Sequence, residues 1–94
     1  MKKSTFKKEV KIWIKRNGLK RKAVYIHDRG DLFLHWKLQS QNDGKYIDLI
    51  ARKDLDPFDN ECIILTIRGM KKLGENIFSL ESDTVERVLL PFEN

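Results

Sequence analysis

The feature that most constrains the fold is a set of apolar residues at every second position in the middle of the chain. The apolar members occupy every second position on both sides of a turn-forming run at residues 42–44: Leu32, Leu34, Trp36, Leu38, Ile47 and Leu49. Because successive side chains of a strand point to opposite faces, this spacing places all of them on one face of a sheet. The sequence therefore predicts antiparallel strands with one buried face, which a shift of one residue would expose.

Further runs of β-branched and aromatic residues extend this sheet. We expect strands over residues 22–28, 31–39, 45–52 and 61–68, and a short strand over residues 76–80. Arg29-Gly30 forms a tight turn in this scheme and adds Tyr25 to the buried face, opposite Leu34. Across the turn at residues 42–44, Leu38 lies opposite Leu49 and Trp36 opposite Ala51. Residues 61–68 are apolar on both faces, which is typical of a central strand, and Gly69 is expected to end it.

Residues 4–17 fit either a helix or a strand. Phe6, Val10 and Ile14 recur at helical spacing, and Ser4 or Thr5 before them would cap such a helix. Gly18 would then supply the left-handed residue that commonly follows a helix. In the strand interpretation Val10, Ile12 and Ile14 alternate and Asn17-Gly18 is a hairpin turn. We favour the helix.

These elements predict an α+β fold and one domain over residues 1–94. It consists of an N-terminal helix, an antiparallel sheet of four to five strands, and a short helix over residues 83–89 that Ser82 would cap and Pro91 would end. A sheet that curls toward a small barrel is the alternative, because two of the strands are apolar on both faces.

Positive charge is concentrated at the start of the chain. Residues 1–22 contain ten Lys or Arg residues against Glu9 alone, a net charge of +9, whereas the remaining nine bases and thirteen acids give −4. Partners respond to such local fields more than to the overall charge of +5. A further group of bases lies in the segment 68–74, between glycines, where we expect a loop.

Clustered cations without matching acids predict contacts with phosphates. We therefore expect a non-enzymatic nucleic-acid-binding or accessory protein that contacts DNA or RNA. The expected contact residues are Lys7, Lys8, Lys11, Lys15, Arg16, Lys20, Arg21, Lys22, Arg68, Lys71 and Lys72.

Two other functions fit the same residues. A small regulator or inhibitor could dock its basic segment on an acidic protein surface. The acidic loop at residues 54–61 of a second copy could provide such a surface, so a homo-oligomer is also possible. A toxin-like, metal-independent ribonuclease is the third possibility, because such enzymes need only basic and aromatic residues.

The remaining chemistry-bearing residues indicate no cofactor, metal or catalytic site. The acidic loop lacks the glycine that a calcium loop requires at its sixth position. His27 and His35 are expected on opposite sides of the sheet, which disfavours a shared metal. Cys62 is the only cysteine and lies in an apolar strand, so we expect a buried thiol, a reducing compartment and a cytoplasmic protein with no membrane partner.

Overall fold

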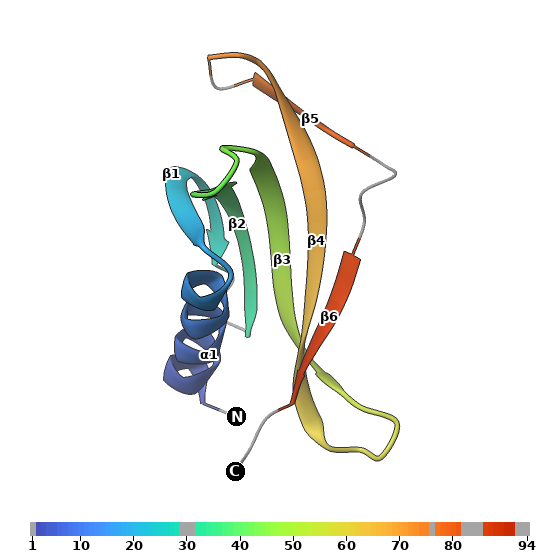
Figure 1. The fold of residues 1–94 in the computed structure, drawn as a ribbon. Coiled ribbons are helices and arrows are strands. Elements are labelled where there is room, and N and C mark those ends of the chain that lie inside the picture. Colours follow the sequence, from blue (N-terminus) through green and yellow to red (C-terminus); the bar gives the residue numbers. More distant parts are fainter. Residues whose placement is uncertain (1, 29–31, 76, 82–85, 92–94) are drawn as a thin grey trace.

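The computed structural model describes residues 2–28, 32–75, 77–81 and 86–91, and for residues 23–28 it describes the backbone alone. The elements along the chain are α1 (Lys3–Arg16), β1 (Leu19–Asp28), β2 (Phe33–Ser40), β3 (Tyr46–Leu55), β4 (Glu61–Gly74), β5 (Ile77–Leu80) and β6 (Glu86–Pro91). All strands join one six-stranded sheet, and α1 lies against one side of it (Figure 1). The expected α+β fold is confirmed, but the expected strand count was too low.

The sheet runs β1-β2-β3-β4, and β4 then has two partners along the same edge. Residues Cys62 to Ile67 pair with β6, and residues from Met70 onward pair with β5. All pairs are antiparallel, and in the described part of the chain no pairing joins β1 to β5 or β6. Over the described residues the sheet is therefore open and does not close into a barrel.

The helix interpretation of residues 4–17 is confirmed. α1 ends where Asn17 N–H donates to the carbonyl of Trp13 at 3.1 Å, and Gly18 follows with a φ of +64°, a conformation that glycine adopts at little cost. The expected cap at Ser4 or Thr5 is wrong, because the helix begins earlier and Lys2 is its N-terminal flanking residue. Among the described residues no helix has the length and hydropathy to cross a membrane.

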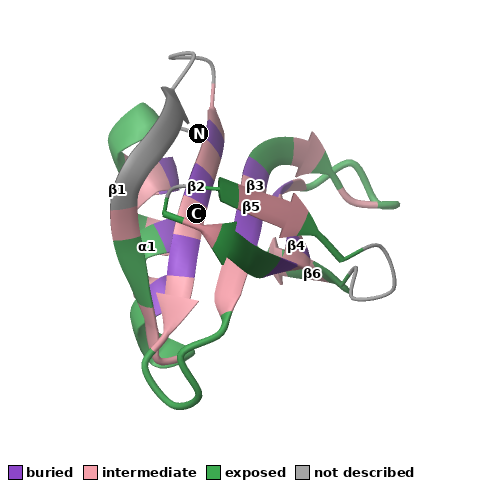
Figure 2. Cartoon of the chain, turned by 90° about the horizontal axis from the view of Figure 1, so that it is seen from above, coloured by how far each residue is buried: buried purple, intermediate pink, exposed green. Residues whose placement is uncertain are grey.

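The core lies between α1 and the sheet face that it covers, which we call the inner face. Phe6, Val10 and Ile14 of α1 are buried in one cluster with residues of the three central strands, and Figure 2 shows the buried positions of α1, β2 and β3 in purple. That cluster contains Leu34, Trp36, Leu38, Leu49, Ala51, Ile63, Leu65 and Ile67. The predicted alternation in β2 and β3 is thus confirmed, with Leu32 and Ile47 packed at its margin.

The strand registers differ from the predicted ones. Leu38 lies opposite Ile47 and Trp36 opposite Leu49, a shift of two residues that keeps the same side chains on the inner face. In the first hairpin an irregularity between Lys22 and Ile26 changes the register and places His27 opposite His35. The predicted placement of the two histidines on opposite sides of the sheet cannot be compared, because the side chain of His27 lies outside the described part of the structure. The predicted turn Arg29-Gly30 and the side chain of Tyr25 lie outside the described residues.

β4 continues through Gly69 to Gly74, so the predicted end of this strand and the loop over 68–74 were wrong. Gly69 marks the place where the partner of β4 changes from β6 to β5. Its carbonyl accepts a hydrogen bond from the N–H of Glu81 at 2.9 Å. A glycine weakens a strand, but pairing with β3 on the other edge runs without interruption from Glu61 to Met70 and holds the strand together.

The C-terminal helix predicted over 83–89 is also wrong, because residues 86–91 form β6. Val88 and Leu90 lie two residues apart and pack against the core, opposite Leu65 and Ile63 of β4. Pairing satisfies backbone groups that an unpaired edge of β4 would expose. The proposed cap Ser82 lies outside the described residues.

Candidate nucleic-acid interface

α1 carries four lysines along one flank, outside the buried positions Phe6, Val10 and Ile14. Lys7, Lys8, Lys11 and Lys15 line one shallow depression of about 540 Å³, and we call these four residues the lysine face. Lys7, Lys11 and Lys15 are spaced four residues apart, which separates successive positions by about 6 Å along the helix axis. Lys8, Lys11 and Lys15 are exposed and form no ion pair with the described residues, so none of the described acids neutralises them.

A groove between α1 and the start of β1 adjoins the lysine face. Its volume is about 350 Å³, and Lys11 and Lys15 line it together with Arg21, Trp36 and Gln41. The guanidinium carbon of Arg21 lies 4.8 Å from the centroid of the Trp36 ring, in the geometry of a cation–π interaction. The basic helix and the first strand therefore share one cationic surface at this point. Arg16 is exposed in the last turn of α1.

Lys20 and Lys22 do not join this surface. Arg21 lies opposite the buried Leu38, on the inner face, whereas Lys20 and Lys22 lie opposite Gln39 and Lys37. Residues paired across antiparallel strands share a face, so these two lysines lie on the side away from α1, which we call the outer face.

The three bases of the segment 68–74 do not all lie on the same face of the sheet. Arg68 lies opposite Asp48 and Lys72 opposite Phe78, both toward the outer face, while Lys71 alternates with them. The structure therefore divides the eleven residues predicted from sequence. Ten of them form two groups, one of six residues on or beside α1 and one of four residues on the outer face, and Lys71 belongs to neither group: the first contains Lys7, Lys8, Lys11, Lys15, Arg16 and Arg21, and the second Lys20, Lys22, Arg68 and Lys72. The single continuous surface that the sequence suggested is not present.

A polar cluster on the outer face was not predicted from sequence. Nε2 of His35 lies 2.5 Å from Oδ1 of Asp48, whose exposed fraction is only 8%. Lys37 and Arg68 stand opposite Asp48 on its two neighbouring strands. We call His35, Lys37, Asp48 and Arg68 the outer-face cluster. The correct strand register would have revealed it, because only that register places Lys37, Asp48 and Arg68 in one row.

Two cations of the outer face lie over aromatic rings. The ammonium of Lys37 is 3.7 Å from the ring centroid of Phe78, and that of Lys72 is 5.8 Å from the ring of Tyr46. Tyr46 and Phe78 contact each other edge to face at 4.9 Å. Nε of Arg68 is buried and has no hydrogen-bond partner among the described residues. The two cation–π contacts favour positions of Lys37 and Lys72 near the aromatic pair.

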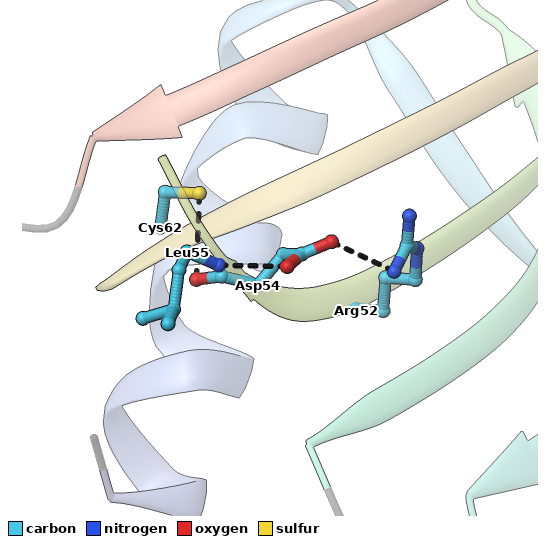
Figure 3. A network of polar contacts seen from close by, with 4 residues as sticks. All are labelled: Arg52, Asp54, Leu55 and Cys62. Carbon is cyan, nitrogen blue, oxygen red and sulfur yellow. Dashed lines mark hydrogen bonds and ion pairs between the residues drawn. The ribbon is translucent and has the colours of Figure 1, made fainter. Parts of the chain in front are cut away.

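The acidic loop uses its carboxylates within the loop. Oδ1 of Asp56 accepts hydrogen bonds from the N–H groups of Phe58 at 2.8 Å and Asn60 at 2.9 Å, and the Asn60 N–H foremost lowers the pKa of Asp56. Asp54 accepts from Nη1 of Arg52 and from its neighbour Leu55 N–H, both at 2.8 Å (Figure 3). These acids order a turn, which explains their density without a ligand.

Cys62 is buried, as predicted. Its exposed fraction is 1%, and its Sγ lies 3.5 Å from the carbonyl oxygen of Asp54 (Figure 3). Burial raises the pKa of this thiol, and the neighbouring Asp54 and Asp56 act in the same direction. Since the thiolate is the reactive form, the position is unsuited to nucleophilic chemistry.

A cavity of about 730 Å³ lies near the C-terminal end of α1. Trp13 and Ile67 give it an apolar wall, and its charged groups are mainly acidic: Asp43, Glu81 and Glu86 against Lys45. An acidic lining repels phosphate, so this cavity does not belong to a nucleic-acid interface.

Comparison with protein-family models, with curated proteins and with solved structures finds no match for this chain.

Proposed function

We propose that this chain binds nucleic acid and contacts its phosphates through the lysine face of α1. The supporting observation is that Lys8, Lys11 and Lys15 are exposed, lie in one depression and have no acidic partner among the described residues. A single strand of B-DNA presents a phosphate about every 3.4 Å along its axis. Successive phosphates are therefore close enough together for the lysine face to contact several of them at once.

Titration of the purified protein with DNA and RNA at two salt concentrations tests this function. If the four lysines each neutralise one phosphate of a duplex, affinity should fall about 150-fold between about 50 and about 200 mM salt, because binding releases condensed counterions. No binding at the lower salt concentration, or an affinity that is insensitive to salt, would contradict the proposal. A pull-down that survives nuclease treatment would instead support an acidic protein partner.

The outer-face cluster supports a second candidate function, metal-independent cleavage of RNA. A carboxylate that holds a histidine ring, as Asp48 holds His35, is an arrangement that orients the ring for proton transfer. In this reaction His35 would take the proton of the ribose 2′-hydroxyl, and the 2′-oxygen would bond to phosphorus. The bond from phosphorus to the 5′-oxygen would break, and that oxygen would take a proton from water. Lys37 and Arg68 would stabilise the charge on the phosphoryl oxygens.

Incubation of end-labelled RNA with excess protein in a chelator tests the second candidate. We expect products that end in a cyclic phosphate, and loss of at least about 100-fold in rate for His35→Asn, since positioned proton transfer contributes that much. An RNA analogue with a 2′-deoxy residue at the cleaved position should stay intact. RNA that is uncleaved by the unaltered protein would dismiss this candidate and leave nucleic-acid binding unaffected.

A further inference from the structure

The groove between α1 and β1 has the chemistry of an anion site. Three cationic side chains and one amide surround it: Lys11, Lys15, Arg21 and Gln41. No acidic residue of the described chain lines it, and none of the three cations forms an ion pair with those residues. Its floor is apolar and consists of buried Ile14 and Trp36 with half-buried Leu19. Cations that converge without an acid favour the binding of an anion.

Trp36 provides a second observation at the same groove. Its exposed fraction is 3%, and its indole Nε1 is buried without a hydrogen-bond partner among the described residues. The guanidinium of Arg21 lies over the ring, which limits the orientations of this otherwise exposed side chain. Arg21 is the only arginine of the groove, and its planar group can form two parallel hydrogen bonds with a phosphate.

We propose that this groove binds one phosphate group of a nucleotide, held by Arg21 and flanked by Lys11 and Lys15. The inference rests on the proposed function for its biological ligand, because Lys11 and Lys15 belong to both the groove and the lysine face. The phosphate can come from within a nucleic-acid strand or from a free nucleotide, and both sources present the same oxygens. A volume of about 350 Å³ accommodates a phosphate with an adjoining sugar.

Fluorescence of Trp36 measures occupancy directly, because an anion that draws Arg21 from the indole ring changes the surroundings of the ring. The chain has two tryptophans, so Trp13→Phe leaves Trp36 as the single emitter. This variant is titrated with inorganic phosphate, a nucleoside monophosphate and a short oligonucleotide without a terminal phosphate. A response to all three indicates an internal phosphate as ligand, and a response to the first two alone indicates a free nucleotide. The NMR signal of the Trp36 indole N–H provides the same readout if Trp13→Phe does not fold.

The decisive comparison is Arg21→Gln with Lys20→Gln. Both remove one exposed cation from β1, but Lys20 lies on the outer face. We expect Arg21→Gln to weaken the phosphate response at least about tenfold, the usual effect of a lost charge-assisted hydrogen bond, and Lys20→Gln to leave it within about twofold. Equal titrations for the two variants, or no response from the unaltered groove, would overturn the site. Salt-sensitive nucleic-acid binding without a groove response would still support the proposed function, and a groove response without nucleic-acid binding would contradict only that function.

Discussion

Replacing Phe6 with alanine should lower the free energy of unfolding by about 3–5 kcal/mol, the largest effect we expect from any single substitution in this chain. Phe6 is 1% exposed and belongs to the core cluster that joins α1 to the inner face. A chain of 94 residues has a total stability of roughly 5–14 kcal/mol, so the loss is a large part of it. Alanine favours a helix more than phenylalanine does, which offsets only a few tenths of a kcal/mol. Urea unfolding followed by circular dichroism measures the change.

The matched control is Phe58→Ala. This phenylalanine is 83% exposed in the turn between β3 and β4, so its removal leaves no cavity. We expect a change of at most about 0.5 kcal/mol, the usual range for exposed positions. Similar unfolding midpoints for the two variants would mean that α1 does not cover the inner face as described.

The central hairpin was predictable because its signal is local. Leu34, Trp36 and Leu38 alternate over a short distance, and any sheet that buries one of them on a face buries the others on the same face. An error of two residues in register therefore leaves the same side chains on the buried face. The same error changes which residues lie opposite each other, because register depends on the geometry of turns and on the irregularity between Lys22 and Ile26.

The C-terminal strand could not be predicted from local pattern alone. Residues 86–91 contain Val88 and Leu90 at strand spacing, but the charged residues around them also suit a helix. What decides between the two is the long strand β4, whose first half needs a second partner beside β3. That need arises from tertiary structure and has no signature within the segment itself.

The candidate site was predictable only in part, for the same reason. Lys7, Lys11 and Lys15 recur at helical spacing, and all three were predicted from sequence as contact residues. The groove depends on how β1 leaves the helix after Gly18, and so brings Arg21 to Trp36 in a way that no local spacing shows. The outer-face cluster depends on register across three strands, which explains why His35 and Asp48 were not recognised as a pair.

A triple substitution on the lysine face should have the largest effect on binding. Lys8, Lys11 and Lys15 are changed to glutamine, which has a similar helix propensity and removes three charges without creating a cavity. If each lysine neutralises one phosphate, the slope of log affinity against log salt should become smaller by about 2.7 for duplex DNA and by about 2.1 for a single strand. At about 0.1 M salt the duplex affinity should then fall by roughly 500-fold, independently of base sequence.

The control carries the same change in charge at Lys45, Lys53 and Arg87, which are exposed and lie outside the lysine face and the groove. Long-range charge affects both variants alike, so we expect the control to lose no more than about threefold in affinity at the same salt concentration. Equal losses would show that overall charge, and not the lysine face, attracts the ligand. If the slope of log affinity against log salt is unchanged in the Lys8, Lys11 and Lys15 variant, α1 is not part of the interface, because counterion release depends on contacts that the variant no longer makes.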